Sequence, residues 1–511
     1  MAIIDAASIG HLLLARAVAT PDRPFLRFGA ERRSFREIAE RSAQLASVLR
    51  AAGIARGDRI GLMLPNGIDY VVSWLAVIRM GAVVVPINTG YQQHDLRYIV
   101  ADSGARLVIT EAPFAAGLEA IRAEVPALER LLRWDDGLRD AVAAAAPELS
   151  VDGLARDTLS VLQYTSGTTG FPKGCMAPHD CWLVAAGNFI GLAGVGADDV
   201  VLIMTPFYYG DFGWNLVLCL ATGAELAILP KFSASTLWRS ARDVGATFFY
   251  CLGTMPVLLL KQPENPAVDR GHRVRYVSCS GIPAEQHQQL ERRFGAPWRE
   301  VYGTTEVGFV TATGLDATAL TGSGSIGRML PGCEGRIVVA SGDDVGPGEV
   351  GEFICRSPGS SLGYWDKPEA TAEWRRDGWA HTGDLMRQDP EGNYYLVGRT
   401  KDMIRRGGEN IAAAEVEAVL CQHPAVGNAA CVAVPDPIRG EEVKAFIQPV
   451  GSAIDPRELV EHCRTRLATF KVPRYFAMVA DFPLTPSQRI EKHKLAATPN
   501  GAFDATTGTW R

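Results

Sequence analysis

Residues 164–174, YTSGTTGFPKG, have the composition of a loop that binds phosphate. Glycine lets a backbone approach an anion closely, hydroxyl groups donate hydrogen bonds to its oxygens, and a lysine adds a compact positive charge. The loop is not of the GxxxxGK[ST] type, because Gly174 follows the lysine and Pro172 precedes it. A flexible surface turn would explain the glycines and the serine but not this ordered series. The pattern therefore predicts phosphate contacts from Thr165, Ser166, Gly167, Thr168, Thr169, Gly170 and Lys173.

The chain around this loop alternates between strand-like and helix-like segments. Residues 159–163 predict the strand that leads into the loop, 59–64 and 81–87 predict two further strands, and 69–79 carry the apolar pattern of a helix. The same alternation recurs at 106–124, 199–227 and 244–260. We therefore expect an α/β architecture in which helices cover the β-sheets.

The composition changes near residue 400, where the polar segment 398–402 (GRTKD) predicts a domain boundary. The residues beyond it, about 110, are enough for a small α+β domain. Its expected elements are a helix at 413–422, strands near 428–434 and 443–449, and a helix that Asp455 caps and Pro456 begins. The end of the chain, 496–511, is rich in Thr, Ala and Gly and is expected to be loosely held.

The overall composition limits the class of function. The 511 residues suggest two to four domains, and an apolar fraction of 47% with 21% charged residues excludes a disordered chain. With 51 Lys and Arg against 57 Asp and Glu, the net charge is −6, and no basic footprint for nucleic acid is visible. We expect no nucleic-acid partner, and the sequence leaves a monomer and a homodimer both open.

Targeting and membrane signals are not visible in the sequence. Residues 1–5 (MAIID) lack the basic and apolar regions of a signal peptide. The two longest charge-free runs, 181–197 and 244–260, fall short of the about 20 apolar residues of a membrane span and are interrupted by Gly, Asn or Pro. The ten cysteines include no CxxC pair, which favours reduced core thiols. We expect a cytoplasmic protein without a membrane span.

Five further motifs follow the loop in the order found in one enzyme superfamily. They are 302–306 (YGTTE), 381–384 (HTGD), 398–402 (GRTKD), 405–410 (RRGGEN) and 470–473 (FKVP). Together with the phosphate loop they resemble the adenylate-forming superfamily, which includes acyl-CoA synthetases, aryl-CoA ligases, luciferases and peptide-synthetase adenylation domains. Among its subgroups, the sequence looks most similar to carnitine/crotonobetaine-CoA ligases and medium-chain acyl-CoA synthetases.

The resemblance implies a role for each motif in the activation of a carboxylic acid by ATP. Lys173 and the hydroxyl loop would bind the β- and γ-phosphates, Thr305 would contact the α-phosphate, and Glu306 would bind Mg²⁺. Asp384 and Arg399 would bind the ribose. The nucleotide site would also contain Ser280, Gly281, Ile282, Pro283, Tyr302, Gly303 and Thr304, with the adenine between Tyr302 and the 280–283 segment.

The resemblance also implies a mobile cap. Residues 1–398 would form the body that binds nucleotide and acid, 399–403 would form a hinge at Asp402, and 404–511 would form a cap that turns between two poses. A few residues in a short polar linker can absorb such a motion. Gly407, Gly408 and Glu409 would border the pantetheine of CoA, whose thiol displaces AMP from the acyl-adenylate.

One loop departs from the pattern of the superfamily. The catalytic lysine usually stands in a Gly-Lys pair, whereas residues 483–492 here read PLTPSQRIEK, with Gln488 and Arg489 in place of the pair. Arginine keeps the charge but presents a planar fork of donors instead of a point charge. We expect Arg489 to take the electrostatic role with altered geometry. Three alternatives stay open: Lys492 takes over the role of the catalytic lysine, the lysine has been replaced by engineering, or the first half-reaction is weakened.

The resemblance places residues 206–214 (PFYYGDFGW) along the acid pocket. Tyr208, Tyr209 and Trp214, together with the carboxylate of Asp211, would suit a cage for a quaternary ammonium group, as in a carnitine-like acid. The alternative is an apolar slot between aromatic rings for an acyl or aryl acid, with Asp211 in a hydrogen bond elsewhere. Both interpretations are open.

Three functions compete on these grounds. The first is an AMP-forming acid–CoA ligase, the second a ligase that passes the adenylate to an amine or another nucleophile, and the third a relative that binds acid or nucleotide without catalysis. The presence of Glu306, Asp384 and Arg399 beside the phosphate loop argues against a loss of catalysis. The 405–410 segment favours CoA as the acceptor.

Overall fold

The computed structural model describes residues 2–165, 172–406, 409–451, 454–484 and 490–510. By compactness the chain divides into two units. Unit 1 consists of Met1–Glu334 and Cys355–Ala380, and unit 2 consists of Gly335–Ile354 and His381–Arg511. The domain limits at 398 and 404 stay a prediction, because compactness does not locate a hinge.

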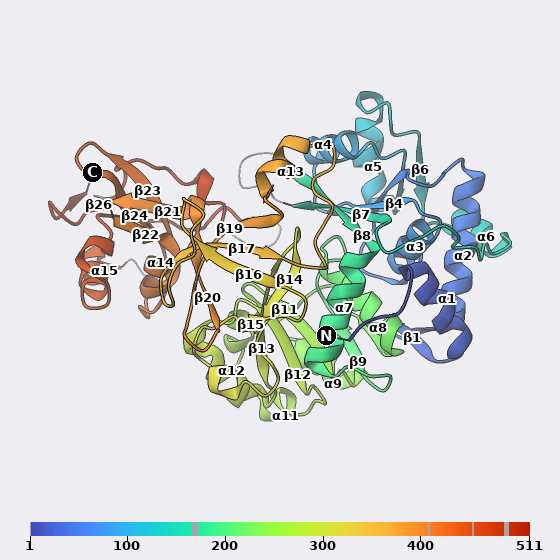
Figure 1. The fold of residues 1–511 in the computed structure, drawn as a ribbon, viewed down its shortest axis with the longest axis horizontal. Coiled ribbons are helices and arrows are strands. Elements are labelled where there is room, and N and C mark those ends of the chain that lie inside the picture. Colours follow the sequence, from blue (N-terminus) through green and yellow to red (C-terminus); the bar gives the residue numbers. More distant parts are fainter. Residues whose placement is uncertain (1, 166–171, 407–408, 452–453, 485–489, 511) are drawn as a thin grey trace. The chain divides into compact units, whose positions relative to one another are not determined.

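A six-stranded sheet in unit 1 contains the hairpin on which the predicted phosphate loop lies (Figure 1). Its order is β6-β5-β3-β4-β7-β8, and its strands are parallel except for the antiparallel pair β7–β8. The strands are β3 (Arg59–Met63), β4 (Val83–Pro86), β5 (Leu107–Thr110), β6 (Arg130–Arg133), β7 (Leu159–Thr165) and β8 (Lys173–Pro178). The strands predicted at 59–64, 81–87 and 159–163 are confirmed.

A nine-stranded sheet forms the other half of unit 1. Its order is β15-β14-β13-β12-β11-β9-β10-β1-β2. The strands from β13 to β1 in this order are parallel, and both ends of the sheet are antiparallel. The strands are β1 (Pro24–Phe28), β2 (Glu31–Ser34), β9 (Val200–Ile203), β10 (Glu225–Ile228), β11 (Phe248–Leu252), β12 (Tyr276–Ser280), β13 (Trp298–Thr304), β14 (Gly308–Ala312) and β15 (Arg328–Met329).

The helices of unit 1 connect these strands. They are α1 (Ile9–Ala19), α2 (Phe35–Ala51), α3 (Ile68–Arg79), α4 (Gln93–Ser103), α5 (Ala112–Ile121), α6 (Asp136–Ala144), α7 (His179–Ala193), α8 (Asp211–Thr222), α9 (Leu237–Val244), α10 (Met255–Leu260), α11 (Pro266–Asp269), α12 (Ala284–Phe294) and α13 (Pro368–Trp374), with short 3-10 turns η1 (Arg122–Glu124) and η2 (Thr318–Leu320).

Helices α3, α7 and α8 form a buried layer between the two sheets (Figure 1). One hydrophobic cluster joins them to both sheets, for example through Ile60, Val201 and Phe212. In α3 every residue except Asp69 is buried. A helix that is apolar on all sides needs such surroundings, so this layer fixes the two sheets against one another.

Each sheet is covered on its outer face as well. In β4, Val84 belongs to the inner cluster, whereas Val83 and Val85 pack with α4 and α5, as the two-residue period of a strand requires. Helices α9 and α12 cover the outer face of the nine-stranded sheet. Burial on both faces explains the continuous apolar run at 81–87. The predicted α/β architecture is confirmed.

The chain passes between the two units within residues 334–381. The strands of this region and the hairpin after it are β16 (Glu334–Val338), β17 (Gly351–Arg356), β18 (Arg375–Arg376), β19 (Trp379–Gln388) and β20 (Tyr394–Arg399). Within unit 2, β19 and β20 are antiparallel neighbours.

Unit 2 is a small α+β domain, as predicted. Its seven-stranded sheet has the order β22-β21-β24-β25-β26-β27, with β23 beside β24. The strands are β21 (Met403–Arg406), β22 (Glu409–Ala412), β23 (Val426–Asp436), β24 (Gly440–Pro449), β25 (Tyr475–Met478), β26 (Phe503–Asp504) and β27 (Thr509–Trp510). Helices α14 (Ala413–Cys421) and α15 (Pro456–Arg464) pack on one face, and the 3-10 turns are η3 (Thr400–Asp402), η4 (Thr469–Lys471) and η5 (Lys492–Lys494). The Asp455 side chain caps α15 and Pro456 begins it, so that prediction is confirmed.

The end of unit 2 is held firmly, contrary to the expectation from its composition. Lys444 in β24 is 1% exposed, and its Nζ donates to the carbonyl oxygens of Ala496, Thr498 and Asn500 at 3.4, 2.9 and 3.2 Å. Residues 502–504 are buried. The expectation was wrong because the hydrogen bonds come from a distant strand, of which the local composition carries no sign.

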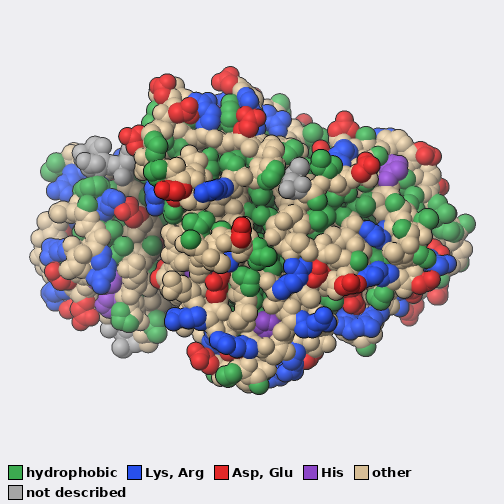
Figure 2. All heavy atoms as spheres, turned by 60° about the horizontal axis from the view of Figure 1, so that its bottom comes forward, with side chains coloured by type: hydrophobic (Ala, Val, Ile, Leu, Met, Phe, Trp, Pro, Cys, Tyr) green, Lys and Arg blue, Asp and Glu red, His purple; other side chains and the backbone are tan. Residues whose placement is uncertain are grey.

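The surface and the thiols agree with the composition. Figure 2 shows acidic and basic side chains interspersed over the face in view. No helix in the described part of the chain combines the length and the apolar content needed to cross a membrane. All ten cysteines belong to the described residues; eight are buried, Cys333 is partly exposed and Cys421 is exposed.

Candidate active site

The hairpin β7–β8 opens at the predicted phosphate loop. Its strands are antiparallel, and Thr165 and Lys173 are Cα partners at the open end. Both side chains are partly buried. Residues 166–171 lie outside the described residues, so the predicted contacts of Ser166, Gly167, Thr168, Thr169 and Gly170 stay predictions. The structure brings Thr165 and Lys173 together at the mouth of the hairpin.

Helix α4 fastens both strands of this hairpin. Tyr98 Oη donates to the carbonyl of Pro172 at 2.7 Å, directly before β8. Asp102, one helical turn later, accepts from Tyr164 Oη at 2.7 Å and from Lys367 Nζ at 2.8 Å. Residues four apart lie on one face of a helix, so one face of α4 holds the chain on both sides of the loop. The Asp102 side chain is 10% exposed, so water screens these contacts little.

A short segment, residues 362–365, pairs with the other edge of β8. Backbone hydrogen bonds of 2.8 Å join Gly363 and Trp365 to β8. The pairing places Tyr364 beside the mouth of the hairpin, where Lys173 Nζ lies 5.2 Å from the centroid of its ring. Tyr364 Oη donates to Glu306 Oε1 at 2.9 Å. One tyrosine therefore contacts both the predicted phosphate-binding lysine and the predicted metal ligand.

Glu306 lies in the turn between β13 and β14. The turn is tight, because a Cβ at Gly303 would lie 2.2 Å from the carbonyl oxygen of Gly308. The Glu306 carbonyl accepts from Ser361 N at 2.7 Å, which ties the turn to the chain just before the 362–365 segment. Thr305, predicted at the α-phosphate, is exposed beside it.

Lys173 and Glu306 carry opposite charges, and no described residue compensates either charge with an ion pair. Among the residues that the structure describes, neither side chain forms an ion pair. Glu306 accepts one side-chain hydrogen bond, from the neutral hydroxyl of Tyr364, and Lys173 contacts the ring of the same tyrosine. A cation and an anion held close together in this way suit a ligand that itself carries both signs of charge.

The segment predicted to hold the adenine, residues 280–283, is anchored by a buried carboxylate. Glu300 in β13 accepts from Gly281 N at 2.5 Å and from Ile282 N at 2.8 Å, with one oxygen for each donor. Burial raises the pKa of Glu300 from 4.5 to about 8, although the two N–H donors act in the opposite direction. Tyr302, two residues further along β13, is buried.

An aromatic cluster lies against the same segment. Tyr250 Oη donates to Ser280 Oγ at 2.9 Å. The Tyr250 ring meets the edge of Trp214 with centroids 5.5 Å apart. Trp214 is 3% exposed and stacks on Phe189 with centroids 4.1 Å apart. Phe309 packs edge-on against Trp214 at 5.7 Å. The Trp214 ring is therefore covered by other rings on its face and at its edges.

The other predicted acid-pocket residues are less buried than Trp214. Tyr208, Tyr209 and Asp211 are partly buried, and the two tyrosine rings meet edge-on with centroids 4.8 Å apart. Gln163 Nε2 donates to the Tyr208 carbonyl at 2.9 Å, which ties this segment to β7 two residues before Thr165. The segment is thus fixed to the strand that leads into the phosphate loop.

In unit 2 the two predicted ribose residues are partners across β19 and β20. Asp384 and Arg399 are paired in register, and Arg399 Nε lies 2.8 Å from Asp384 Oδ1. Asp384 is buried. Glu352 holds the turn before it, because its oxygens accept from Gly383 N at 3.2 Å and lie 3.1 Å from His381 Nδ1. The structure therefore brings this predicted pair together.

Comparison with known proteins identifies the family. The model of the AMP-binding enzyme matches residues 13–365, and the model of the AMP-binding enzyme C-terminal domain matches residues 415–489. The first match covers more than half of the chain. The chain belongs to the AMP-binding enzyme family. This confirms the resemblance to the acyl-CoA synthetases of the adenylate-forming superfamily.

The relatives of the chain define its reaction. Feruloyl-CoA synthase from Amycolatopsis sp is 34% identical over 95% of this chain and 97% of that protein. Sulfoacetate–CoA ligase from Cupriavidus necator is 32% identical over 96% of this chain and 97% of that protein. ATP-bound MatB from Rhodopseudomonas palustris has a TM-score of 0.86 and 27% identity over 95% of this chain and 97% of that chain. The chain is an AMP-forming acid–CoA ligase, which forms an acyl-adenylate from ATP and then a thioester with CoA.

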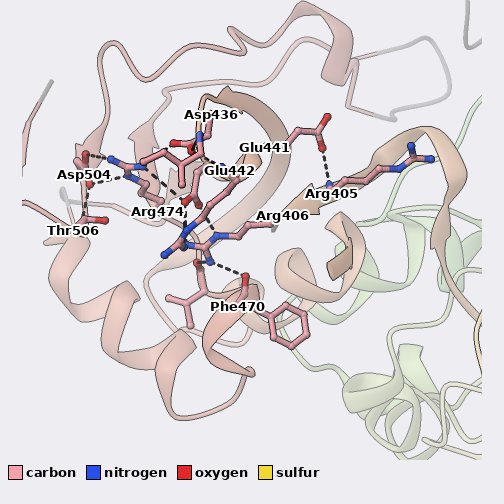
Figure 3. Close-up of polar contacts among 12 residues, drawn as sticks. Arg405, Arg406, Asp436, Glu441, Glu442, Phe470, Arg474, Asp504 and Thr506 are labelled. Carbon is pink, nitrogen blue, oxygen red and sulfur yellow. Dashed lines mark hydrogen bonds and ion pairs between the residues drawn. The ribbon is translucent and has the colours of Figure 1, made fainter. Parts of the chain in front are cut away.

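The two arginines before the predicted CoA segment of the ligase have different surroundings (Figure 3). Arg406 points into unit 2, where its Nε lies 2.7 Å from Glu442 Oε2 and its Nη1 donates to the Phe470 carbonyl at 2.7 Å. Arg405 is exposed, and its side chain points away from this network. Arg406 therefore links two sequence motifs structurally, whereas the charge of Arg405 is available at the surface.

The CoA segment itself is described only in part. Gly407 and Gly408 lie outside the described residues, and of Glu409 the structure describes only the backbone, which pairs with Arg406 where β22 begins. Their predicted contacts with pantetheine stay predictions. Arg489 also lies outside the described residues.

Lys492, the alternative to Arg489 in the sequence, is held by two carboxylates of unit 2. Its Nζ lies 2.7 Å from Glu417 Oε1 and 3.7 Å from Asp402 Oδ2. Burial lowers the pKa of Lys492, but the two carboxylates outweigh burial and raise it. These ion pairs join the predicted hinge residue to the segment that follows the loop of Arg489.

Four residues that hold site segments in place were not found from the sequence: Asp102, Glu300, Glu352 and Tyr364. Each acts on residues far along the chain, as with Tyr364, which is 58 positions from Glu306. The sequence offers a signal for one of them, Glu300. It stands inside the strand-like segment 298–302 (WREVY), and a charged side chain that is buried in a strand needs a partner.

Glu300→Gln tests the anchor of the 280–283 segment. Gln offers one acceptor oxygen in place of two, because its amide nitrogen only donates. One of the two backbone donors therefore loses its partner, and we expect the free energy of unfolding to fall by about 1–3 kcal/mol. Because folding raises the pKa of Glu300 from 4.5 to about 8, its contribution to stability is complete below pH 4.5 and is lost as the pH rises through 8. The difference in melting temperature between parent and variant should therefore shrink as the pH rises from 4.5 to about 8 and stay constant above that.

Thermal unfolding followed by circular dichroism measures this difference. Glu285→Gln is the matched control, because Glu285 is exposed at the start of α12. A difference between parent and Glu300→Gln that widens with pH would contradict the assignment of a raised pKa to Glu300.

Proposed function

We propose that the ligase binds Mg·ATP at the mouth of the β7–β8 hairpin, with the triphosphate on Lys173 and the metal ion on Glu306. The observation behind the proposal is the pair of opposite, uncompensated charges on either side of Tyr364. A triphosphate with a bound cation would satisfy both charges at once. Thr165, at the same mouth, is positioned to donate to a phosphate oxygen.

The residues present fit Mg²⁺. One oxygen of Glu306 accepts from Tyr364, which leaves the other for a cation. Within the described residues, no group of three or more His, Cys, Asp or Glu could hold a metal ion. A single carboxylate is enough, since Mg²⁺ keeps several waters and is commonly bound through one or two carboxylates plus substrate phosphates. When bound, the ion neutralises charge on the phosphates.

The remaining nucleotide contacts follow from the same proposal. The 280–283 segment and Tyr302 hold the adenine, Asp384 and Arg399 hold the ribose, and Thr305 contacts the α-phosphate. The carboxylate of the acid attacks that phosphorus, the bond to the β-phosphate breaks, and pyrophosphate leaves. The CoA thiol then attacks the acyl carbon, AMP leaves, and the thiol gives up its proton. Two of these segments are anchored by buried groups, which supports the proposal. Glu300 holds the 280–283 segment, and the buried Asp384 pairs with Arg399.

The proposal extends to the cap. Residues 404–511 turn about a hinge at 399–403, and Gly407, Gly408 and Glu409 border the incoming pantetheine. The ion pair between Lys492 and Asp402 supports the choice of Asp402, because it couples the hinge residue to the segment next to the Arg489 loop. The burial of eight cysteines inside the protein supports a cytoplasmic location, since buried thiols are typical of proteins in a reducing compartment.

For the acid we propose a neutral acyl or aryl compound bound in a slot between aromatic rings. A cage for a quaternary ammonium group needs open ring faces. The Trp214 face is covered by Phe189, and its edges meet Tyr250 and Phe309, which supports the slot. The buried Trp214 would form the closed end of the slot and limit the length of the acid.

Lys173→Met tests the phosphate site. Loss of one preorganised charge at the reacting phosphates should lower the rate of pyrophosphate release by about a hundredfold or more. Conversion of a supplied acyl-adenylate to the CoA thioester should change little, because pyrophosphate has already left. Lys261→Met is the matched control, because Lys261 is exposed at the end of α10. Equal losses in both half-reactions would contradict the assignment.

The identity of the acid is tested by a pyrophosphate-release screen with and without CoA. The panel contains short acyl, long-chain acyl, aryl and betaine acids. We expect short acyl or aryl acids to react fastest and long-chain acids to react slowly, because Trp214 closes the slot. Trp214→Ala should increase the rate with longer acids. A betaine that reacts as efficiently as a neutral acid of the same length would contradict the slot.

Arg489→Lys tests the departure in the catalytic loop. If the planar guanidinium of Arg489 limits the first half-reaction, a lysine should increase the rate of pyrophosphate exchange, and Arg489→Ala should nearly abolish it. Lys492→Gln is the comparison, because Lys492 is already paired with Glu417 and Asp402 and should affect stability more than exchange. An unchanged exchange rate in Arg489→Lys would contradict a limiting role for this side chain.

A further inference from the structure

Tyr364 contacts both Lys173 and Glu306, the two oppositely charged residues of the proposed phosphate site. Its ring is 5.2 Å from Lys173 Nζ, and its hydroxyl donates to Glu306 Oε1 at 2.9 Å. The resemblance to the superfamily assigns this tyrosine no role, and the sequence places it 58 positions from Glu306. Its position therefore needs an explanation of its own.

The tyrosine is fixed by the strand that carries the lysine. The 362–365 segment is hydrogen-bonded to β8 on both sides of Tyr364, through Gly363 and Trp365. The Tyr364 N–H donates to Thr371 Oγ1 at 2.9 Å, in the helix that follows. These contacts fix the backbone of Tyr364 relative to β8 and to the helix that follows.

The neighbouring chain also fixes the carboxylate. Ser361 N donates to the Glu306 carbonyl at 2.7 Å, and Tyr364 donates to the Glu306 side chain. The same stretch thus holds the backbone and the side chain of the predicted metal ligand.

The physical problem at this site is the attraction between a lysine and a glutamate. A lysine side chain is a point charge on a flexible stem, and a direct pair with Glu306 would neutralise both groups before the nucleotide arrives. An aromatic ring holds an ammonium weakly at its face, and a phenol hydroxyl satisfies one carboxylate oxygen without neutralising its charge. Tyrosine supplies both contacts from one side chain.

We propose that Tyr364 is a positioning residue that keeps Lys173 and Glu306 apart and oriented for the triphosphate and its metal ion. The inference rests on the proposed function of these two residues. It predicts that the hydroxyl of Tyr364 governs metal affinity and that its ring governs the availability of Lys173.

Two substitutions separate these contributions. Tyr364→Phe keeps the ring and removes the donor, so the Mg²⁺ concentration for half-maximal pyrophosphate release should rise about tenfold, the effect of one hydrogen bond to a charged group. The KM for the acid should stay unchanged. Tyr364→Leu removes the ring as well, so the lysine can pair with Glu306, and the KM for ATP should rise in addition.

A readout independent of activity is the affinity for Mn²⁺ in the presence of ATP, measured by electron paramagnetic resonance. Tyr364→Phe should weaken it by the same factor as the half-maximal Mg²⁺ concentration. Tyr395→Phe is the matched control, because Tyr395 Oη also donates to a carboxylate, that of Asp389 at 3.0 Å, in unit 2. The control should bind Mn²⁺ and ATP like the parent.

The outcomes distinguish this inference from the proposed function. If Glu306→Gln weakens Mn²⁺ binding and Tyr364→Phe does not, the role of Tyr364 is overturned and the metal site stands. If Glu306→Gln leaves Mn²⁺ binding unchanged, the metal site itself is overturned. If Tyr364→Phe and Tyr395→Phe weaken Mn²⁺ binding equally, the effect is one of general stability and the positioning role is overturned.

Discussion

The site proposed for this ligase depends on two opposite charges, Lys173 and Glu306, that contact the same tyrosine and form no ion pair within the described part of the chain. Pairing would be favourable for the empty protein, since a lysine and a carboxylate within reach attract strongly where water is scarce. An ion pair between Lys173 and Glu306 would also cancel the electrostatic field that would attract a metal–triphosphate. The hydrogen bond and the ring contact of Tyr364 resolve this conflict, because each satisfies one partner without cancelling its charge. The site therefore holds its charges ready in advance, which is the arrangement that lowers the reorganisation cost of catalysis.

Such an arrangement requires a scaffold that cannot relax around it. The hairpin β7–β8 is held by α4 on one side and by the 362–365 segment on the other. Beneath it, α3, α7 and α8 are buried between two sheets, so a shift of either sheet would open voids in a close-packed core. The predicted site residues Lys173 and Glu306 lie at a strand end and in a turn, whereas α3 beneath them is buried except for Asp69. Rigid support with functional loops is the usual division within a domain.

Much of this was predictable from the sequence, and the reason differs for each part. The buried strand at β4 and the cap of α15 follow from local patterns, the period of apolar residues and the Asp455–Pro456 pair. Thr165, Lys173 and Glu306 could be predicted as site residues because their motifs are local as well. Asp102, Glu300 and Tyr364 were not, since each acts on residues that only the fold brings near, and a single tyrosine or aspartate carries no sign of its partner. The firm hold of Lys444 on the end of the chain escaped prediction for the same reason.

The overall charge of the chain adds a constraint on how ATP and CoA are bound. A net charge of −6 gives no long-range attraction for polyanionic substrates, so recognition depends on short-range contacts with a few cations. Of the two arginines before the predicted CoA segment, only one has a side chain that is available to bind a polyanion. Arg406 is committed to Glu442, which is 1% exposed, and to the Phe470 carbonyl, whereas Arg405 stays at the surface. On the proposed function, the binding of ATP therefore depends on cations such as Lys173 that no described carboxylate neutralises. Because Lys173 is partly buried, added salt screens it less than it would screen an exposed lysine, and substrate binding should depend more on the geometry around Tyr364 than on ionic strength.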